Sequence, residues 1–222
     1  MREETFQGLG EQAHEGTREA MSEGVTGRAV REARLERQTK ETRIRARLNL
    51  DGTGQAEVRT GVGFFDHMLT AWSRFAYVDL ELVAEGDLEV DPHHTIEDCG
   101  IVLGQALREA LSDKQGIERC GEALLPMDES LVQVALDISN RPYLVWDVNC
   151  PPGSVGNFPV EMAEEFFRAF VQAGLTLHIR LLSGKNRHHI LEAVFKGVGR
   201  ALGQAVRKNP RYSGVLSTKG VL

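Results

Sequence analysis

Cysteine, aromatic residues and long hydrophobic runs are all scarce in this 222-residue sequence. Its three cysteines, Cys99, Cys120 and Cys150, are far apart and form no C-x-x-C pair. This excludes a disulfide framework and a thiolate zinc site, so we expect all three in or near the core. No apolar run approaches the ~18–20 residues of a membrane-spanning helix, and the N-terminus has no apolar stretch that could serve as a secretory signal. We therefore expect a cytoplasmic protein.

An excess of positive charge is also missing. The sequence has 26 Lys plus Arg against 32 Asp plus Glu, which gives a net charge of −6 at pH 7 with histidines neutral. Nucleic acids and anionic membranes need a basic surface, so we expect neither as a partner. The 41% of hydrophobic residues fits an ordinary soluble core, in one domain or two small ones.

Residues 1–36 differ in composition from the rest. They are rich in Glu and Arg, carry scattered Gly, and contain Phe6 as their one aromatic residue. Such a segment buries little apolar surface to offset the entropy lost on ordering. We predict a mobile tail or weak helix at 1–36 and a folded domain at 37–222.

The folded part reads as an internal duplication, with repeat one at about 37–124 and repeat two at about 125–222. In repeat one, 42–50 alternates with period two, and a turn at Asp51-Gly52 predicts a hairpin with a partner strand at 55–60. A helix, a strand and a long amphipathic helix are then expected at 63–75, 77–87 and 93–111. Repeat two has the same order, with strands at 130–141, 142–150 and 175–184 and helices at 159–174 and 188–206.

This pattern predicts an α+β fold of two αβ halves. We expect each half to have a four-stranded sheet with two helices packed on one face, and the halves to share a core. Each half is too small to be stable comfortably alone, so further burial in a homo-oligomer is expected.

The motif HHxxE occurs twice, once in each repeat: His93, His94 and Glu97 first, then His188, His189 and Glu192. Residues i and i+4 share a helix face, so the first His and the Glu of each motif can bind one metal, while the second His points elsewhere. A single His-His pair is more often a surface or capping pair, but two in register favour two metal centres. Imidazole and carboxylate donors suit Mn(II), Fe(II) or Zn(II), with Mn preferred for octahedral geometry.

Third donors are predicted from the duplication. His67 lies 26 residues before His93, and Glu165 lies 23 residues before His188. If the repeats correspond, these two residues are equivalent ligands of the two sites.

A phosphate group is the second expected ligand. The C-terminal S-T-K-G at 217–220 combines a hydroxyl, an ammonium and a flexible backbone, and Arg119, Arg141 and Lys196 are further cations beside element ends. No G-x-x-x-x-G-K and no G-x-G-x-x-G after a strand is present, so nucleotide binding is unsupported.

From about Arg37 to Leu222 the sequence closely resembles the imidazoleglycerol-phosphate dehydratase family. The resemblance rests on seven segments: T-K-E-T-R-I (39–44), G-F-F-D-H-M-L (63–69), D-P-H-H-T-I-E-D (91–98), P-M-D-E (126–129), S-N-R-P-Y-L (139–144), N-R-H-H-I-L-E-A-V-F-K (186–196) and S-G-V-L-S-T-K-G (213–220). It implies a metal-dependent lyase that dehydrates imidazole glycerol phosphate to imidazole acetol phosphate in histidine biosynthesis. It also implies two Mn(II) per active site and a 24-mer of trimers with active sites between subunits.

The resemblance also implies roles for individual residues. Metal ligands would be His67, His93, His94, Glu97, His188, His189 and Glu192. Acid/base candidates would be Glu41 and Glu192. The phosphate grip would be Arg119, Arg141, Lys196, Ser217 and Lys219.

The sequence departs from the family pattern in two places. Residues 164–167 read E-E-F-F where E-H-F-F is usual, so Glu165 replaces a histidine ligand with a carboxylate that can still hold Mn(II). Ala71 and Phe75 stand where Gln and His are usual. Two alternatives follow: a catalytically impaired structural homologue that keeps its metal, and a dinuclear metal hydrolase. A phosphate grip at the C-terminus disfavours the hydrolase, because the phosphate then serves as a handle.

Overall fold

The computed structural model describes residues 31–222, so most of the predicted tail lies outside the described residues. Two four-stranded sheets form its outer layers. The first contains β1 (Glu32–Gln38), β2 (Thr42–Asn49), β3 (Ala56–Arg59) and β4 (Asp79–Gly86), in the order β1-β2-β4-β3. The second contains β5 (Cys120–Met127), β6 (Ser130–Asp137), β7 (Tyr143–Asp147) and β10 (Thr176–Ser183), in the order β5-β6-β10-β7. A short pair, β8 (Ser154–Val155) and β9 (Phe158–Pro159), lies apart from both.

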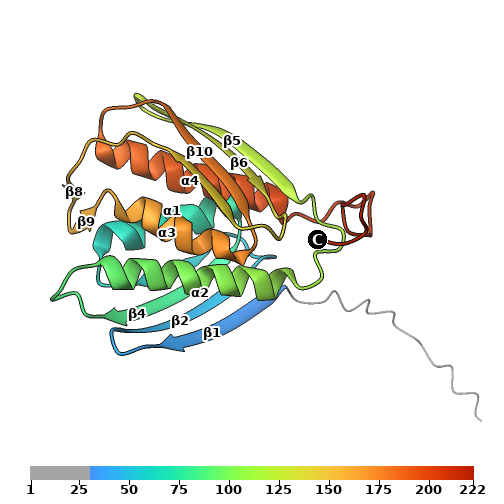
Figure 1. Ribbon diagram of the computed structural model, residues 1–222, viewed down its shortest axis with the longest axis horizontal. Coiled ribbons are helices and arrows are strands. Elements are labelled where there is room, and N and C mark those ends of the chain that lie inside the picture. Colours follow the sequence, from blue (N-terminus) through green and yellow to red (C-terminus); the bar gives the residue numbers. More distant parts are fainter. Residues whose placement is uncertain (1–30) are drawn as a thin grey trace, which may run out of the picture.

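The helices lie between the two sheets (Figure 1). They are α1 (Gly63–Ala76), α2 (His93–Leu111), α3 (Met162–Phe170), which continues as the 3₁₀ turn η1 (Val171–Ala173), and α4 (Arg187–Ala205). This arrangement confirms the predicted α+β fold, with two similar halves around a shared core. Within residues 31–222, no helix has the length and apolar character needed to cross a membrane.

Alternating side chains build each half around this central layer. In β2, Ile44, Ala46 and Leu48 are buried toward the helices, while Arg43 and Arg45 are exposed on the outer face. The period of two therefore gives the sheet one apolar face, which the apolar sides of the helices cover.

The two halves exchange helix contacts. The first-half helix α1 packs most extensively against α4, and α2 packs against α3 of the second half. Glycines permit this close approach: a Cβ on Gly100 would lie 2.6 Å from the carbonyl oxygen of Phe166, and one on Gly104 would lie 2.8 Å from that of Phe170. Gly199 and Gly203 of α4 meet the backbone of α1 in the same way. The halves therefore share their core at the level of the helix backbones.

Two elements begin before the boundaries expected from the sequence, and one expected strand pairing is wrong. β1 begins at Glu32, inside the expected tail, because its inward residues Ala33 and Leu35 are masked in the sequence by the charged residues that alternate with them. The first strand of the second sheet begins at Cys120, before the expected start of repeat two at about 125.

The expected hairpin between 42–50 and 55–60 does not form. β4 pairs antiparallel with all eight residues of β2, and the four-residue β3 pairs parallel with the far side of β4. The second half behaves in the same way, since β10 separates β6 from β7. In each half the longer strand, β4 or β10, lies in the interior of the sheet, because it can form more backbone hydrogen bonds than the shorter β3 or β7.

Candidate functional site

Both HHxxE motifs lie at helix N-termini, as the sequence predicted. His93 and His94 open α2, and the Asp91 carboxylate accepts a hydrogen bond from the backbone N–H of His93 at 2.7 Å. In α4, the side chain of Asn186 accepts hydrogen bonds from the backbone N–H groups of His188 and His189, at 2.9 and 3.4 Å. These caps satisfy the helix ends through backbone groups and leave the imidazoles available.

Three predicted ligands converge where α1 meets α4. Glu192 Oε2 lies 2.9 Å from His188 Nε2 and 3.4 Å from His67 Nε2. One ligand atom from each of these residues lies within 4.8 Å of the others, which makes them the one such group of three among residues 31–222. Because α1 packs on α4, His67 of the first half joins the motif of the second half.

Glu192 is the most enclosed member of this group, with 5% of its surface exposed. Burial raises its pKa, but a hydrogen bond and the charge of Lys196, with smaller effects of His188 and His67, outweigh burial and set the pKa below its usual value. Lys196 also lies over the Phe75 ring, 5.3 Å from its centroid. The carboxylate is therefore held ionised at neutral pH, as a metal ligand or a proton acceptor requires.

The first motif is more open. His93 Nε2 lies 3.9 Å from Glu97 Oε2, and both side chains are more than 40% exposed. Glu165 lies instead 3.9 Å from the guanidinium of Arg168, and no group of three ligand atoms in the described part of the chain includes it. Its predicted equivalence to His67 agrees with the helix register, because Trp72 and Phe170 meet corresponding glycines on α4 and α2. Its role as a ligand stays a prediction.

The second histidine of each motif contacts a carboxylate that sequence reasoning missed. His94 Nδ1 lies 3.0 Å from Asp87, and His189 Nδ1 lies 2.7 Å from Glu129. These hydrogen bonds raise the pKa of both imidazoles. The signal for Glu129 was present in the P-M-D-E segment, to which no role had been assigned.

Glu41 lies near His94, whose pKa its negative charge helps to raise. Its side chain is exposed and makes no hydrogen bond or ion pair within residues 31–222. The predicted acid/base candidates are thus one free carboxylate, Glu41, and one buried and paired carboxylate, Glu192.

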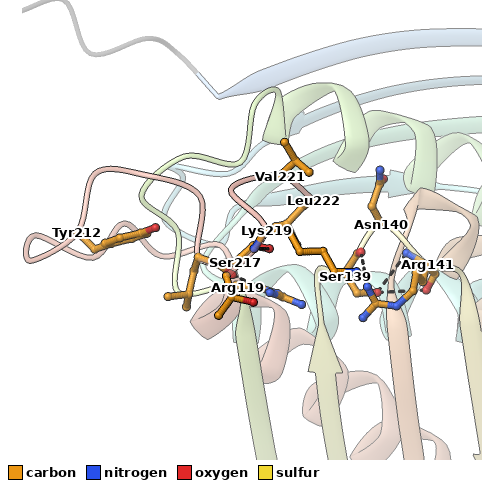
Figure 2. Close-up of a pocket in the computed structure, with 11 residues that line it drawn as sticks. Arg119, Ser139, Asn140, Arg141, Tyr212, Ser217, Lys219, Val221 and Leu222 are labelled. Atoms are coloured by element: carbon orange, nitrogen blue, oxygen red, sulfur yellow. Dashed lines mark hydrogen bonds between the residues drawn. The ribbon is translucent and has the colours of Figure 1, made fainter.

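Four of the five predicted phosphate-binding residues surround one pocket of about 1010 Å³. Arg119, Arg141, Ser217 and Lys219 lie together there, with Ser139 and Asn140 (Figure 2). Arg119 donates to both oxygens of Asp137, at 2.7 and 3.0 Å, and to the carbonyl of Leu216 at 2.6 Å. Cations, a hydroxyl and an amide around one hollow suit a phosphate dianion.

Lys196 does not belong to this pocket within one chain, because its ammonium is paired with Glu192. The pocket and the histidine group also lie at opposite ends of α4. His188 is in the first turn of α4, whereas Arg119 donates its backbone N–H to the carbonyl of Ala205, the last residue, at 2.9 Å. At 1.5 Å per residue, about 26 Å of helix separates them.

Comparison with known proteins places this geometry in one family. The family model described as imidazoleglycerol-phosphate dehydratase matches residues 60–202, which include both HHxxE motifs and Arg119. Imidazoleglycerol-phosphate dehydratase of Desulfitobacterium hafniense (strain Y51) is 77% identical over 194 residues, covering 87% of this chain and 99% of that protein. The same-named protein of Moorella thermoacetica is 56% identical, covering 86% and 98% of the two chains.

Solved structures agree with the sequence relatives. The imidazoleglycerol-phosphate dehydratase of Staphylococcus aureus matches with a TM-score of 0.73 and 41% identity, over 80% of this chain and 99% of that one. The Pyrococcus furiosus enzyme in complex with (S)-C348 matches with a TM-score of 0.74 and 43% identity, over 85% and 100%. With the paired histidine motifs, the cationic pocket and the duplicated fold all present in one chain, it belongs to the imidazoleglycerol-phosphate dehydratase family and is a hydro-lyase of histidine biosynthesis.

Proposed function

We propose that this chain dehydrates imidazole glycerol phosphate to imidazole acetol phosphate with two divalent metal ions per active site. The observation that carries the metal is the convergence of His67, His188 and Glu192, whose donor set of two imidazoles and one carboxylate fits Mn(II). His93, His94, Glu97 and His189 would complete the ligands, with Glu165 in the place of a histidine. When bound, the metal would act as a Lewis acid that holds the substrate imidazole and balances the charge developing on it.

The residues of the chain supply proton transfer and the grip on the substrate. The reaction breaks one C–H and one C–O bond and releases water, so it needs a carboxylate to carry the proton and no redox cofactor. Glu41 and Glu192 are the candidates, and the side chain of Glu41 is exposed and makes no hydrogen bond or ion pair among the described residues. Arg119, Arg141, Ser217 and Lys219 would hold the phosphate as a handle away from the reacting carbons.

Assembly of several copies follows from the separation of these two sites. Imidazole glycerol phosphate spans roughly 8 Å between ring and phosphate, at bond lengths of about 1.5 Å. One chain cannot hold both ends across about 26 Å of helix. We therefore propose a homo-oligomer in which one subunit supplies the metal ligands and another the phosphate pocket. A 24-mer of trimers is the assembly that the family resemblance implies, and the cytoplasm is the compartment expected for such an enzyme.

Mixing two impaired variants tests this proposal. His188→Ala removes a metal ligand, and Lys219→Ala removes a phosphate contact. At a substrate concentration far below the raised KM of Lys219→Ala, each variant alone should lose most turnover of imidazole glycerol phosphate in the presence of Mn(II). Co-assembly of the two variants should restore part of it, because some sites then combine two intact halves. An inactive wild-type protein with its metal bound would support the impaired homologue. Release of inorganic phosphate would support the hydrolase.

A further inference from the structure

The carboxylate of Glu129 holds two parts of the site at once. Oε1 accepts hydrogen bonds from the backbone N–H groups of Lys185 and Asn186, at 3.0 and 2.8 Å, and Oε2 lies 2.7 Å from His189 Nδ1. A carboxylate only accepts, so Nδ1 of His189 carries the proton. The neutral ring then has its lone pair on Nε2, which lies 3.6 Å from Asp128 Oδ2 and is the atom that can bind a metal.

Position 129 is the duplicate of position 41. K-E-T-R-I-R-A-R-L-N-L at 40–50 aligns with D-E-S-L-V-Q-V-A-L-D-I at 128–138, and each glutamate directly precedes the second strand of its half. In both halves a glycine lies close to the second strand and to the long helix. Gly86 lies against Thr42 and Thr95 in the first half, and Gly184 lies against Ser130 and Ile190 in the second. The two glutamates therefore occupy corresponding places, yet their contacts differ.

The residue after each glycine accounts for the difference. In the first half it is Asp87, whose carboxylate accepts from His94 Nδ1 at 3.0 Å. In the second half it is Lys185, which has no acceptor to offer an imidazole. His189 takes its carboxylate from Glu129 instead, whereas Glu41 makes no side-chain hydrogen bond or ion pair in the described part of the chain.

We propose that Glu129 is a positioning residue that orients His189 to bind metal through Nε2. Because Glu129 is engaged in this contact, it does not take part in the proton transfer proposed for Glu41, the residue at the corresponding position of the first half. The proposal rests on the proposed function, in which these histidines bind a divalent metal. Outer carboxylates of this kind fix the tautomer and ring orientation of a histidine ligand. The two corresponding carboxylates of the duplicated chain, those of Glu41 and Glu129, therefore have different roles.

Glu129→Gln separates positioning from support of the helix. The glutamine carbonyl can still accept from the two backbone N–H groups, but its amide would donate toward Nδ1 and reverse the tautomer of His189. At a pH above the raised pKa of His189, titration of the metal-free, full-length protein with Mn(II) alone should show one class of site weakened about 10–100-fold, with the melting temperature of the metal-free protein unchanged at that pH. Glu41→Gln is the matched control, which should keep Mn(II) affinity and lose turnover. Unchanged Mn(II) affinity and stoichiometry in Glu129→Gln would overturn the proposal.

A second variant tests whether the carboxylate that contacts His189 can be moved to the position that Asp87 has in the first half. Adding Lys185→Asp to Glu129→Gln recreates the first-half arrangement, so Mn(II) affinity should return toward that of the wild type. If the double variant bound Mn(II) as weakly as Glu129→Gln alone, a carboxylate at position 185 could not replace the one at position 129, and the proposal would be overturned. Failure of the wild-type protein to bind Mn(II) at all would instead contradict the proposed function.

Discussion

Arg31 occupies in the first half of the molecule the place that Arg119 occupies in the second. Each arginine directly precedes the first strand of its half. Arg31 donates to both oxygens of Asp51, and Arg119 donates to both oxygens of Asp137. The remaining guanidinium nitrogen donates to a carbonyl of the C-terminal part of the chain, that of Val206 at 2.5 Å or that of Leu216 at 2.6 Å. Arg31 is buried, with 8% of its surface exposed, whereas Arg119 lines the pocket that contains the other predicted phosphate-binding residues. The same set of contacts therefore lies in the interior in one half and at a pocket in the other.

Arg31→Ala is expected to destabilise the fold. The Arg31 side chain is 9% exposed and that of Asp51 29%, so the substitution removes a partly buried ion pair and the side-chain donor to the Val206 carbonyl. We expect a loss of about 2–3 kcal/mol in the free energy of unfolding. This corresponds to a melting temperature lower by about 4–12 °C. Thermal unfolding at fixed protein concentration measures it, and kcat should stay at the wild-type level below the transition.

Lys219→Ala is expected to weaken substrate binding without loss of metal. A charge-assisted hydrogen bond to phosphate contributes about 1.5–3 kcal/mol, so KM should rise about 10–100-fold. Lys208→Ala is the control, since Lys208 donates to the Gln115 carbonyl outside the pocket. Steady-state kinetics and metal analysis of both variants provide the measurement. Wild-type kinetics for Lys219→Ala would remove the C-terminal motif from the site.

Glu165→Ala is expected to lose metal from one of the two sites, and most turnover with it. Glu165→His should keep the fold and shift preference from Mn(II) toward Zn(II), Co(II) or Ni(II), because an imidazole replaces a carboxylate oxygen. Glu164→Ala is the matched control, since Glu164 pairs with Arg168 at 2.5 Å on the same helix. Metal-to-protein ratios decide the matter, and an unchanged ratio in Glu165→Ala would refute the ligand role.

Removal of metal is expected to break the assembly into smaller oligomers. Ligands contributed by separate helices are best completed by a neighbouring subunit, so metal binding and association should be linked. Light scattering before and after treatment with a chelator measures the change in mass. A single species of constant mass under both conditions would contradict the link.

Mn(II) affinity is expected to fall with decreasing pH, beginning above the ordinary imidazole pKa of 6.5, because Asp87 and Glu129 raise the pKa of His94 and His189. Protons then compete with the metal at a higher pH than at a free imidazole. In the metal-free protein the sign is opposite: the two charged contacts stabilise the fold at low pH and are lost as pH rises through the raised pKa values. Mn(II) titrations between about pH 8 and pH 6 test the first statement, and metal-free melting curves test the second.

Local periodicity predicted the helices and the contacts within them. α2 begins and ends where the sequence pattern placed it, and the i,i+4 spacing of His188 and Glu192 became a contact of 2.9 Å. Strand order depended on information that the pattern does not contain. The hairpin turn at Asp51-Gly52 is local, whereas insertion of β4 between β2 and β3 is decided by which strand pairs along the greater length.

Long-range features of the site were the hardest to predict. Spacing made His67 a donor to one of two centres, but only the packing of α1 on α4 joins it to Glu192. Asp87 and Glu129 were missed because a carboxylate that supports a histidine follows no fixed spacing. His94 takes one seven residues earlier, and His189 takes one sixty residues earlier.

The exchange of helix contacts between the halves has a consequence for how the chain can be divided. A cut between Leu111 and Cys120 would give two fragments, each with a sheet, one short helix and one long helix that has glycines at its helix contact. In neither fragment would the long helix find the partner whose backbone its glycines fit. Each long helix could recover that partner only from the other fragment, so the chain is organised like a domain-swapped dimer joined in tandem, and its fragments should fold only when they are produced together.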